Sequence, residues 1–125
     1  MQVIKIDSLN EDISIIDIDD TLEDIYEQLD CDIFECPITL DNRDCLYVDE
    51  EGLFVNEYKG AFYFGDCPHP LFGNGLIIGT SIEGDNEDAL SNIRTIKNKV
   101  TFIPEETGKH LLNQIRLSGS TFIPY

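Results

Sequence analysis

The chain of 125 residues carries 25 Asp and Glu residues against 8 Lys and Arg, a formal net charge of -17 at pH 7. Its length fits one domain with a single core, and no apolar run is long enough for a transmembrane helix, so we expect no membrane contact. Because a binder of DNA or RNA needs lysine and arginine to displace counterions from the phosphates, this composition disfavours direct nucleic-acid binding.

The N-terminal part of the chain predicts two strands and a helix. Residues 2–6 and 13–18 are rich in alternating apolar and β-branched residues, which favours strands. Asp20 or Thr21 can cap a helix that runs to residue 29, with apolar residues at helical spacing and acidic residues in its first turn. The start of the chain has neither a basic stretch nor a long apolar core, so we expect no signal peptide and a cytoplasmic protein.

The middle of the chain predicts successive short strands. The pattern favours a strand at 32–38, followed by a hairpin in which strands at 45–48 and 53–57 flank the turn "DEEG". The aromatic run at 60–65 is typical of a strand or a tucked loop. The segment 66–75, with its prolines and glycines, is expected to be irregular.

The C-terminal part predicts alternating strands and helices. The apolar run at 76–82 predicts a central strand, and an acidic loop after it leads into a helix that reaches residue 96. A strand at 99–103 and a helix at 104–117 follow, and an extended tail at 120–125 could join the sheet. Since strands outnumber helices and mostly follow one another directly, we expect one α+β domain over the whole chain. It has a mostly antiparallel β-sheet with two or three helices packed on it.

The cysteines are spaced too widely for a structural zinc site. They are Cys31, Cys36, Cys45 and Cys67. They include no Cys-x-x-Cys pair, and the two histidines lie far apart, so we expect no metal site and no cofactor. In a cytosolic chain this spacing predicts four reduced, mostly buried thiols.

The stretch from Asp17 to Thr21 resembles the first motif of the haloacid-dehalogenase-like phosphatases, in which the first Asp is the nucleophile and the second the acid/base. Residues similar to the later motifs are Thr80, Ser81, Asp85 and Asp88. The resemblance implies a magnesium-dependent phosphatase. That family also needs a lysine between its later motifs and a parallel sheet with helical crossovers, and neither is expected here. We therefore expect Asp17 to Thr21 to end a strand and cap a helix.

A second resemblance covers the chain from about residue 2 to about residue 90. The segments "IDIDDTLEDIYEQLDCDIFEC", "LYVDEEGLFVNEYKGAFYFGD" and "GNGLIIGTSIEGDNED" together resemble domain of unknown function 3846, a small family found largely in phages and mobile elements. The matching positions are Asp19, Thr21, Leu22, Glu23, Glu50, Glu51, Gly52 and Asn56. The resemblance implies no known enzyme activity, and it implies a phage or prophage setting in the host cytoplasm.

That setting favours a non-enzymatic counter-defence protein, because small acidic phage proteins without catalytic motifs often antagonise host defence. The first hypothesis is sequestration of a small nucleotide immune signal, such as a cyclic nucleotide or a cyclic ADP-ribose. The ligand needs aromatic faces for its base and cations or amides for its phosphates. Candidate ligand-binding residues are Asn56, Tyr58, Phe62, Phe64, Arg94, Lys97 and Arg116. The alternative for the aromatic residues is a place in the core.

The second hypothesis is an acidic DNA mimic, or another inhibitor that binds a basic host protein. Residues 1–58 hold 18 of the acidic residues and two basic ones, whereas residues 59–125 hold seven and six. The acidic half attracts basic surfaces, although the alternative is a solvated face that keeps the protein soluble. A DNA mimic usually spreads its charge over most of its surface, so the neutral half favours the nucleotide hypothesis. The aromatic run and the C-terminal tail predict a homo-oligomer.

Overall fold

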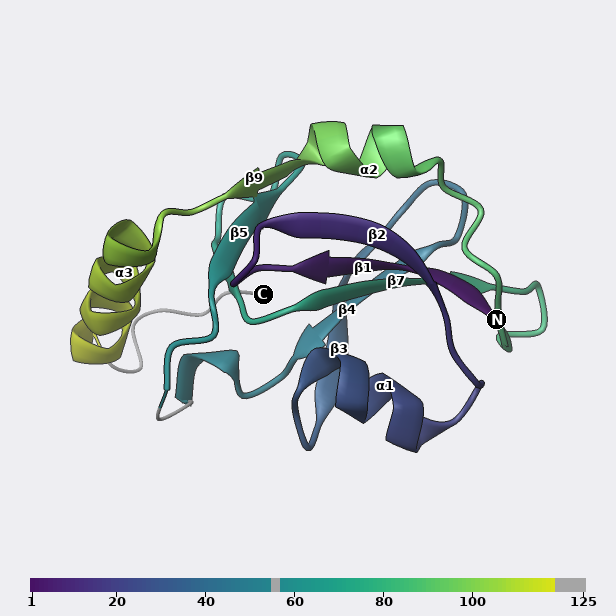
Figure 1. Cartoon of the computed structure of the whole chain (residues 1–125), viewed down its shortest axis with the longest axis horizontal. Helices are drawn as coiled ribbons and strands as arrows, with labels where there is room; N and C mark the ends of the chain where they lie inside the picture. Colours follow the sequence, from purple (N-terminus) through teal and green to yellow (C-terminus); the bar gives the residue numbers. More distant parts are fainter. Residues whose placement is uncertain (55–56, 119–125) are drawn as a thin grey trace.

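The computed structural model describes residues 1–54 and 57–118, which form nine strands and three helices (Figure 1). The strands are β1 (Gln2–Asp7), β2 (Asp12–Asp17), β3 (Phe34–Thr39), β4 (Cys45–Asp49), β5 (Ala61–Phe64), β6 (Leu71–Phe72), β7 (Gly75–Thr80), β8 (Asn86–Glu87) and β9 (Val100–Phe102). The helices are α1 (Leu22–Leu29), α2 (Ile93–Lys99) and α3 (Glu105–Ser118), with a 3-10 turn, η1 (Gly52–Phe54). None of the helices in these two ranges is long and apolar enough to cross a membrane.

Six strands form the main sheet, in the order β2-β1-β7-β4-β3 with β8 paired to β7. Every pairing within it is antiparallel. A smaller antiparallel sheet has the order β6-β5-β9. The α+β class and the mostly antiparallel sheet that the sequence predicts are confirmed.

The central strand β7 is buried on both faces of the main sheet. Its Leu76 and Ile78 pack against Ile25 and Leu29 of α1 on one face. Its Ile77 faces the opposite side, in a cluster that contains residues of β5 and α2. A strand buried on both faces has a continuous apolar sequence instead of an alternating one, which explains the run "LIIG". Thus α1 covers one face of the sheet, and the smaller sheet and α2 cover the other (Figure 1).

One predicted hairpin is wrong. The sequence predicts that residues 53–57 return as a strand beside 45–48, but β4 is hydrogen-bonded to β3 on one edge and to β7 on the other. Neither edge can therefore accept another strand. Instead, Gly52 begins η1 and lies so close to the carbonyl oxygen of Phe72 that an added Cβ would sit 2.9 Å from it.

The other predicted elements within the described residues are confirmed to within about three residues of their ends. The predicted irregular segment at 66–75 does contain one short strand, β6. The predicted C-terminal strand at 120–125 lies outside the described residues, so it stays a prediction.

A buried carboxylate connects the main sheet to the loop before α2. Asp44, at the entrance to β4, has 0% of its surface exposed. Its carboxylate accepts hydrogen bonds from the backbone N–H groups of Leu90 and Ser91 and from Ser91 Oγ, at 2.6–3.1 Å. A buried charge is tolerated when several donors satisfy it, and here the donors come from a segment almost fifty residues away.

We expect Asp44→Ala to lower the free energy of unfolding by about 2–4 kcal/mol, because it leaves these donors buried without an acceptor. Ser91→Ala, which removes one donor and keeps the carboxylate, should cost about 1 kcal/mol. Urea unfolding followed by circular dichroism measures both values. Equal and small effects of the two substitutions would contradict the role given to Asp44.

Candidate functional site

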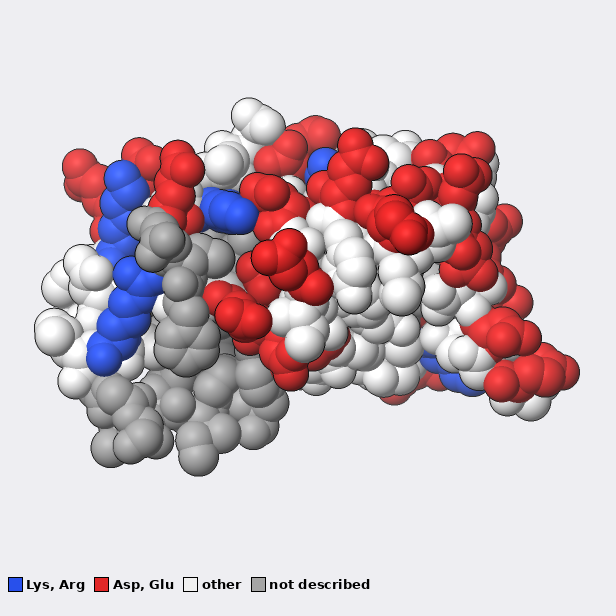
Figure 2. All heavy atoms as spheres, turned by 90° about the horizontal axis from the view of Figure 1, so that it is seen from below, with Lys and Arg blue, Asp and Glu red and all other residues white. Residues whose placement is uncertain are grey.

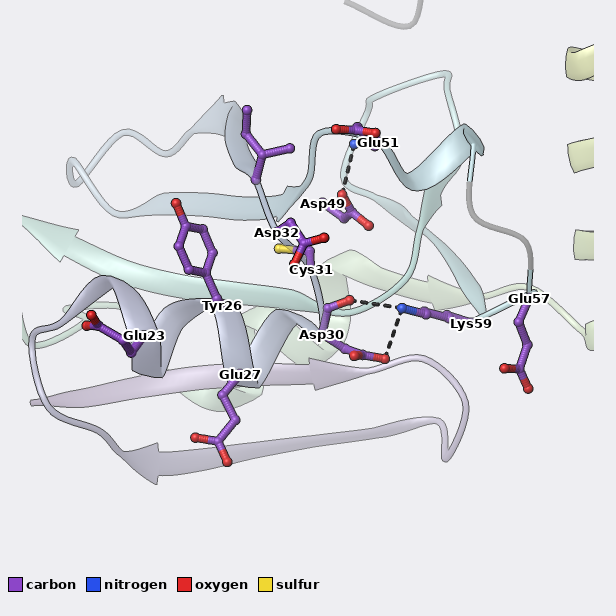
Figure 3. A pocket seen from close by; sticks show the side chains of 11 residues that line it. Glu23, Tyr26, Glu27, Asp30, Cys31, Asp32, Asp49, Glu51, Glu57 and Lys59 are labelled. Carbon is purple, nitrogen blue, oxygen red and sulfur yellow. Dashed lines mark hydrogen bonds and ion pairs between the residues drawn. The ribbon is translucent and has the colours of Figure 1, made fainter.

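An open cleft of about 840 Å³ lies on the α1 side of the main sheet (Figure 3). Its walls come from α1, the loop that follows α1, the end of β4 and the segment before β5. Seven of its eleven lining residues are carboxylates: Glu23, Glu27, Asp30, Asp32, Asp49, Glu51 and Glu57. The other four are Tyr26, Cys31, Ile33 and Lys59. We refer to this set of eleven residues as the acidic cleft.

Helix α1 positions its acidic side chains by burying its apolar stripe. Ile25 and Leu29 have 2% and 1% of their surface exposed and face the sheet, so the polar residues between them face outward. The helix starts at Thr21, whose Oγ1 accepts a hydrogen bond from the backbone N–H of Asp24. It ends at Asp30, which adopts a left-handed conformation with φ 53°. The residues that follow this reversal, 31–33, line the cleft and lead into β3.

Lys59 is the single cation among the residues that line the cleft. Its Nζ lies 3.0 Å from the carboxylate of Asp30 and also donates to the Asp30 backbone carbonyl at 3.0 Å (Figure 3). The lysine therefore joins the segment before β5 to the end of α1. It is also an ammonium group bound within the acidic cleft, which illustrates the contacts that this site can make with a cation.

Asp49 is the most enclosed carboxylate of the cleft, with 8% of its surface exposed. Its Oδ1 accepts a hydrogen bond from the backbone N–H of Glu51 at 2.8 Å. Burial raises the pKa of Asp49, and the nearby charges of Asp32 and Asp30 add to this, whereas the Glu51 hydrogen bond and Lys59 oppose it. The charged form of Asp49 is thus disfavoured, and a cation that enters the cleft would stabilise it.

The cleft offers no reactive thiol, although Cys31 is part of its lining. Burial raises the pKa of Cys31 to about 11, and the negative charge of Asp49 adds to the shift. The thiol is therefore protonated at neutral pH, and a protonated thiol is a poor nucleophile.

Aromatic residues extend the surface from the cleft toward β3 and β4. Tyr26 lines the cleft, and its ring centre lies 5.3 Å from that of Phe34. Phe34 in turn meets Tyr47 edge to face, also at 5.3 Å. A face with aromatic rings beside carboxylates suits the side chain of arginine or lysine, because the rings contact its flat or apolar part and the carboxylates its charge.

The face that carries α1 is dominated by acidic residues. Figure 2 views the molecule from this side and shows acidic side chains over much of its surface, with basic ones mainly toward the α3 end. Within the described residues, no three His, Cys, Asp or Glu side chains are arranged to hold a metal ion. The carboxylates of the cleft are thus spread over a surface and are not gathered around one point.

The residues that the nucleotide hypothesis selects are not brought together. Phe62 and Phe64 have 0% and 3% of their surface exposed and pack in the core, which agrees with the alternative that these aromatic residues are structural. Arg94 and Lys97 are exposed on α2, on the opposite side of the main sheet from α1 (Figure 1).

Two of the three remaining candidates are associated with α3. Arg116 is on α3, and its Nε donates to the backbone carbonyl of Leu53 at 2.8 Å. Tyr58 is half-buried in the cluster that anchors α3, with Nζ of Lys109 6.0 Å from its ring centre. Asn56 lies outside the described residues. The described candidates therefore lie in the core, on two separate helices and, for Tyr58, in the segment that packs against α3.

The Asp-x-Asp-x-Thr stretch ends a strand and caps a helix, as the sequence predicts. Asp17, the last residue of the edge strand β2, forms an ion pair at 2.9 Å with the N-terminal amine. Asp19 donates its backbone N–H to the carboxylate of Asp24, and Thr21 is the N-cap of α1. The phosphatase motif instead follows a parallel strand at the point where the sheet order reverses.

The chain matches the model of Domain of unknown function (DUF3846) over residues 1–101, and it belongs to this family. The match contains all strands of the main sheet, α1 and α2, and ends within β9. The resemblance stated from the sequence is confirmed and extends beyond residue 90. No curated protein and no solved structure matches the chain.

The raised pKa of Asp49 predicts a pH-dependent stability. The folded chain holds this proton more tightly than the unfolded chain, whose Asp has a pKa near 3.8. Folding therefore becomes less favourable as the pH rises from that value through the higher folded pKa, and the penalty stays at neutral pH. We expect Asp49→Asn, which keeps an oxygen for the Glu51 N–H, to be more stable than the wild type at pH 7.

Urea unfolding of both proteins at pH 7 and at about pH 4 measures this difference, which should shrink at the lower pH. Asp32→Asn, at an exposed position of the same cleft, is the matched control and should change the stability less. An Asp49→Asn protein that is less stable than the wild type at pH 7 would contradict the assignment.

Proposed function

We propose that this chain is a non-enzymatic binding protein whose acidic cleft receives a lysine- and arginine-rich segment of a partner protein. The observation that carries the proposal is the lining of the cleft, with seven carboxylates and one lysine on a single open surface. Such an array attracts basic protein surfaces and repels phosphates, so it favours a protein partner over a nucleotide.

The ionic state of the cleft supports this proposal. Among the described residues, Asp30 is the only one of the seven carboxylates in an ion pair, and its partner is Lys59. Each of the other six lacks an ion-pair partner within the described residues, and Lys59 is the one cation among the lining residues, so their mutual repulsion costs free energy in the isolated protein. A basic partner relieves that repulsion on binding, and the Lys59–Asp30 contact is the geometry that its lysines would repeat.

The shape of the site supports an extended partner. The cleft is open and about 840 Å³ in volume, which accommodates several side chains at once. Tyr26 and the exposed Ile33 provide apolar contacts beside the carboxylates. Apolar contacts add affinity that salt does not screen, whereas exposed ion pairs alone contribute little each.

The family resemblance implies a phage setting, and in that setting a protein that binds basic partners can act against host defence. A basic host protein, such as a defence enzyme whose surface binds nucleic acid, is the partner class that we propose, and the carboxylates would replace its phosphates. This is the second hypothesis drawn from the sequence. Nucleotide sequestration stays a prediction, and it has less support because its candidate residues lie apart. The homo-oligomer and the host-cytoplasm setting also stay predictions.

A fluorescein-labelled nona-arginine peptide is the probe for the proposal, with a nona-glutamate peptide as the charge control. Fluorescence anisotropy at low salt measures the affinity. The cleft variant carries Glu23→Gln, Glu27→Gln, Asp32→Asn and Glu51→Gln. The matched control carries Glu11→Gln, Asp12→Asn, Glu83→Gln and Glu106→Gln, which change the net charge equally outside the cleft.

We expect the cleft variant to bind the peptide about tenfold more weakly or worse, since four ion pairs at about 0.2–1 kcal/mol each are lost. The control should stay within about threefold of the wild type, because it changes only the long-range field. Equal weakening in the two variants would show that net charge, and not the cleft, attracts the peptide. The absence of binding by the wild type at low salt would contradict the proposal.

A further inference from the structure

Two cysteines face each other across the β3–β4 hairpin. Thr39 pairs with Cys45 in the register of these strands, and an irregularity between Glu35 and Ile38 leaves Cys36 and Pro37 opposite Tyr47. The bulge brings Cys36 to the same face as Cys45. This face is the one opposite Leu46 and Val48, which point into the core.

The two sulfur atoms share one hydroxyl group. Oγ1 of Thr39 lies 3.8 Å from Sγ of Cys36 and 4.0 Å from Sγ of Cys45. Each of the two thiols lies close enough to the other to affect its pKa. The Cys45 sulfur lies 3.4 Å from Oγ1 of Thr80 on the neighbouring strand β7. The contacts of the pair thus involve three adjacent strands, β3, β4 and β7.

The pair is accessible. Cys36 is exposed and lies on β3, which is at one edge of the main sheet, while Cys45 on the neighbouring strand β4 is half-buried. The prediction that the thiols are mostly buried is wrong, since none of the four cysteines is fully buried. β3 carries Cys36 and Pro37 at its edge, and a bulged edge strand leaves side chains open to solvent.

The two thiols differ in acidity. Burial opposes ionisation of Cys45, but hydrogen bonds from Thr80, Cys36 and Thr39 together lower its pKa. Although the residue is exposed overall, partial desolvation of its thiol by the surrounding atoms raises the pKa of Cys36 to about 11, and the neighbouring Cys45 adds to this shift. Cys45 is therefore the thiol that ionises first, with the proton of Cys36 available to stabilise its thiolate.

We propose that Cys36 and Cys45 are a dithiol pair that a low-molecular-weight disulfide, such as oxidised glutathione, converts into a disulfide across the β3–β4 hairpin. The Cys45 thiolate attacks one sulfur of the small disulfide, which breaks its S–S bond and releases one thiolate. Cys36 then loses its proton to that base or to water and attacks Sγ of Cys45, releasing the second thiol. The protein loses two electrons and two protons, and the small disulfide becomes two thiols.

This bond would join the edge strand to β4, the strand whose end carries Asp49 of the acidic cleft. The inference does not depend on the proposed function, because it rests on the contacts of the two thiols alone.

A variant with Cys31→Ser and Cys67→Ser isolates the pair for the test. The reduced protein is incubated with oxidised glutathione, the free thiols are alkylated, and trypsin cleaves after Arg43 between the two cysteines. Mass spectrometry should then find the peptides of Cys36 and Cys45 joined, with the loss of two hydrogens. The further variant Cys36→Ser should stop at a glutathione adduct on Cys45, because the second thiol is missing.

Two results would overturn the proposal. One is a pair that keeps both thiols or carries two separate glutathione adducts while circular dichroism shows a folded protein. The other is slower adduct formation on Cys45 in the Cys36→Ser variant than on Cys36 in a Cys45→Ser variant, which would make Cys36 the attacking thiol.

Discussion

The burial of β7 on both faces is the constraint on which the rest of the structure depends. Leu76 and Ile78 require a cover on one face of the main sheet, and Ile77 requires one on the other. Each large aliphatic side chain contributes about 1.5–3 kcal/mol when it is fully buried, so neither face can stay open. Helix α1 covers the first face, and β5 and α2 cover the second. The position of α1, and with it the acidic cleft, follows from this requirement.

The order of the strands explains why the uneven distribution of charge along the chain becomes an uneven distribution over the surface of the folded protein. β1 to β4 and α1 all come from the acidic first half, and they surround β7, which comes from the neutral second half. The smaller sheet, α2 and α3 are built from the second half alone. Since the interior of the main sheet is largely apolar, most of the carboxylates lie on the surface, and those of α1 and the adjoining loops meet at one cleft.

Most of the fold could be predicted from the sequence, because local patterns decide it. The alternating strands, the capped helix at Thr21 and the apolar run of β7 are each visible within about ten residues. The predicted hairpin after β4 failed because the pattern at 53–57 cannot show that both edges of β4 are already paired, one of them with a strand almost thirty residues away. The predicted hairpin thus failed at a place where pairing with a strand far along the chain, and not the local sequence pattern, decides the structure.

The site could be predicted only in part. The excess of acidic residues in the first half is visible in the sequence. Their meeting at one cleft is not, because it requires α1, the end of β4 and the segment before β5 to come together in the fold. No pattern in the sequence indicates that Lys59 pairs with Asp30, which lies 29 residues earlier. Conversely, the aromatic run of β5 suggested ligand contacts, whereas Phe62 and Phe64 supply the core beneath the main sheet. Aromatic residues in sequence do not reveal whether their faces are exposed.

The measurement that tests the central claim most directly is a titration of the isotope-labelled protein with the nona-arginine peptide, followed by amide NMR. The account predicts that the largest shift changes occur within 23–33, 49–51 and 57–59, the segments that contain the residues of the acidic cleft. Changes that are spread evenly over the acidic surface, or that gather on α2 and α3, would contradict the claim that the cleft is the binding site.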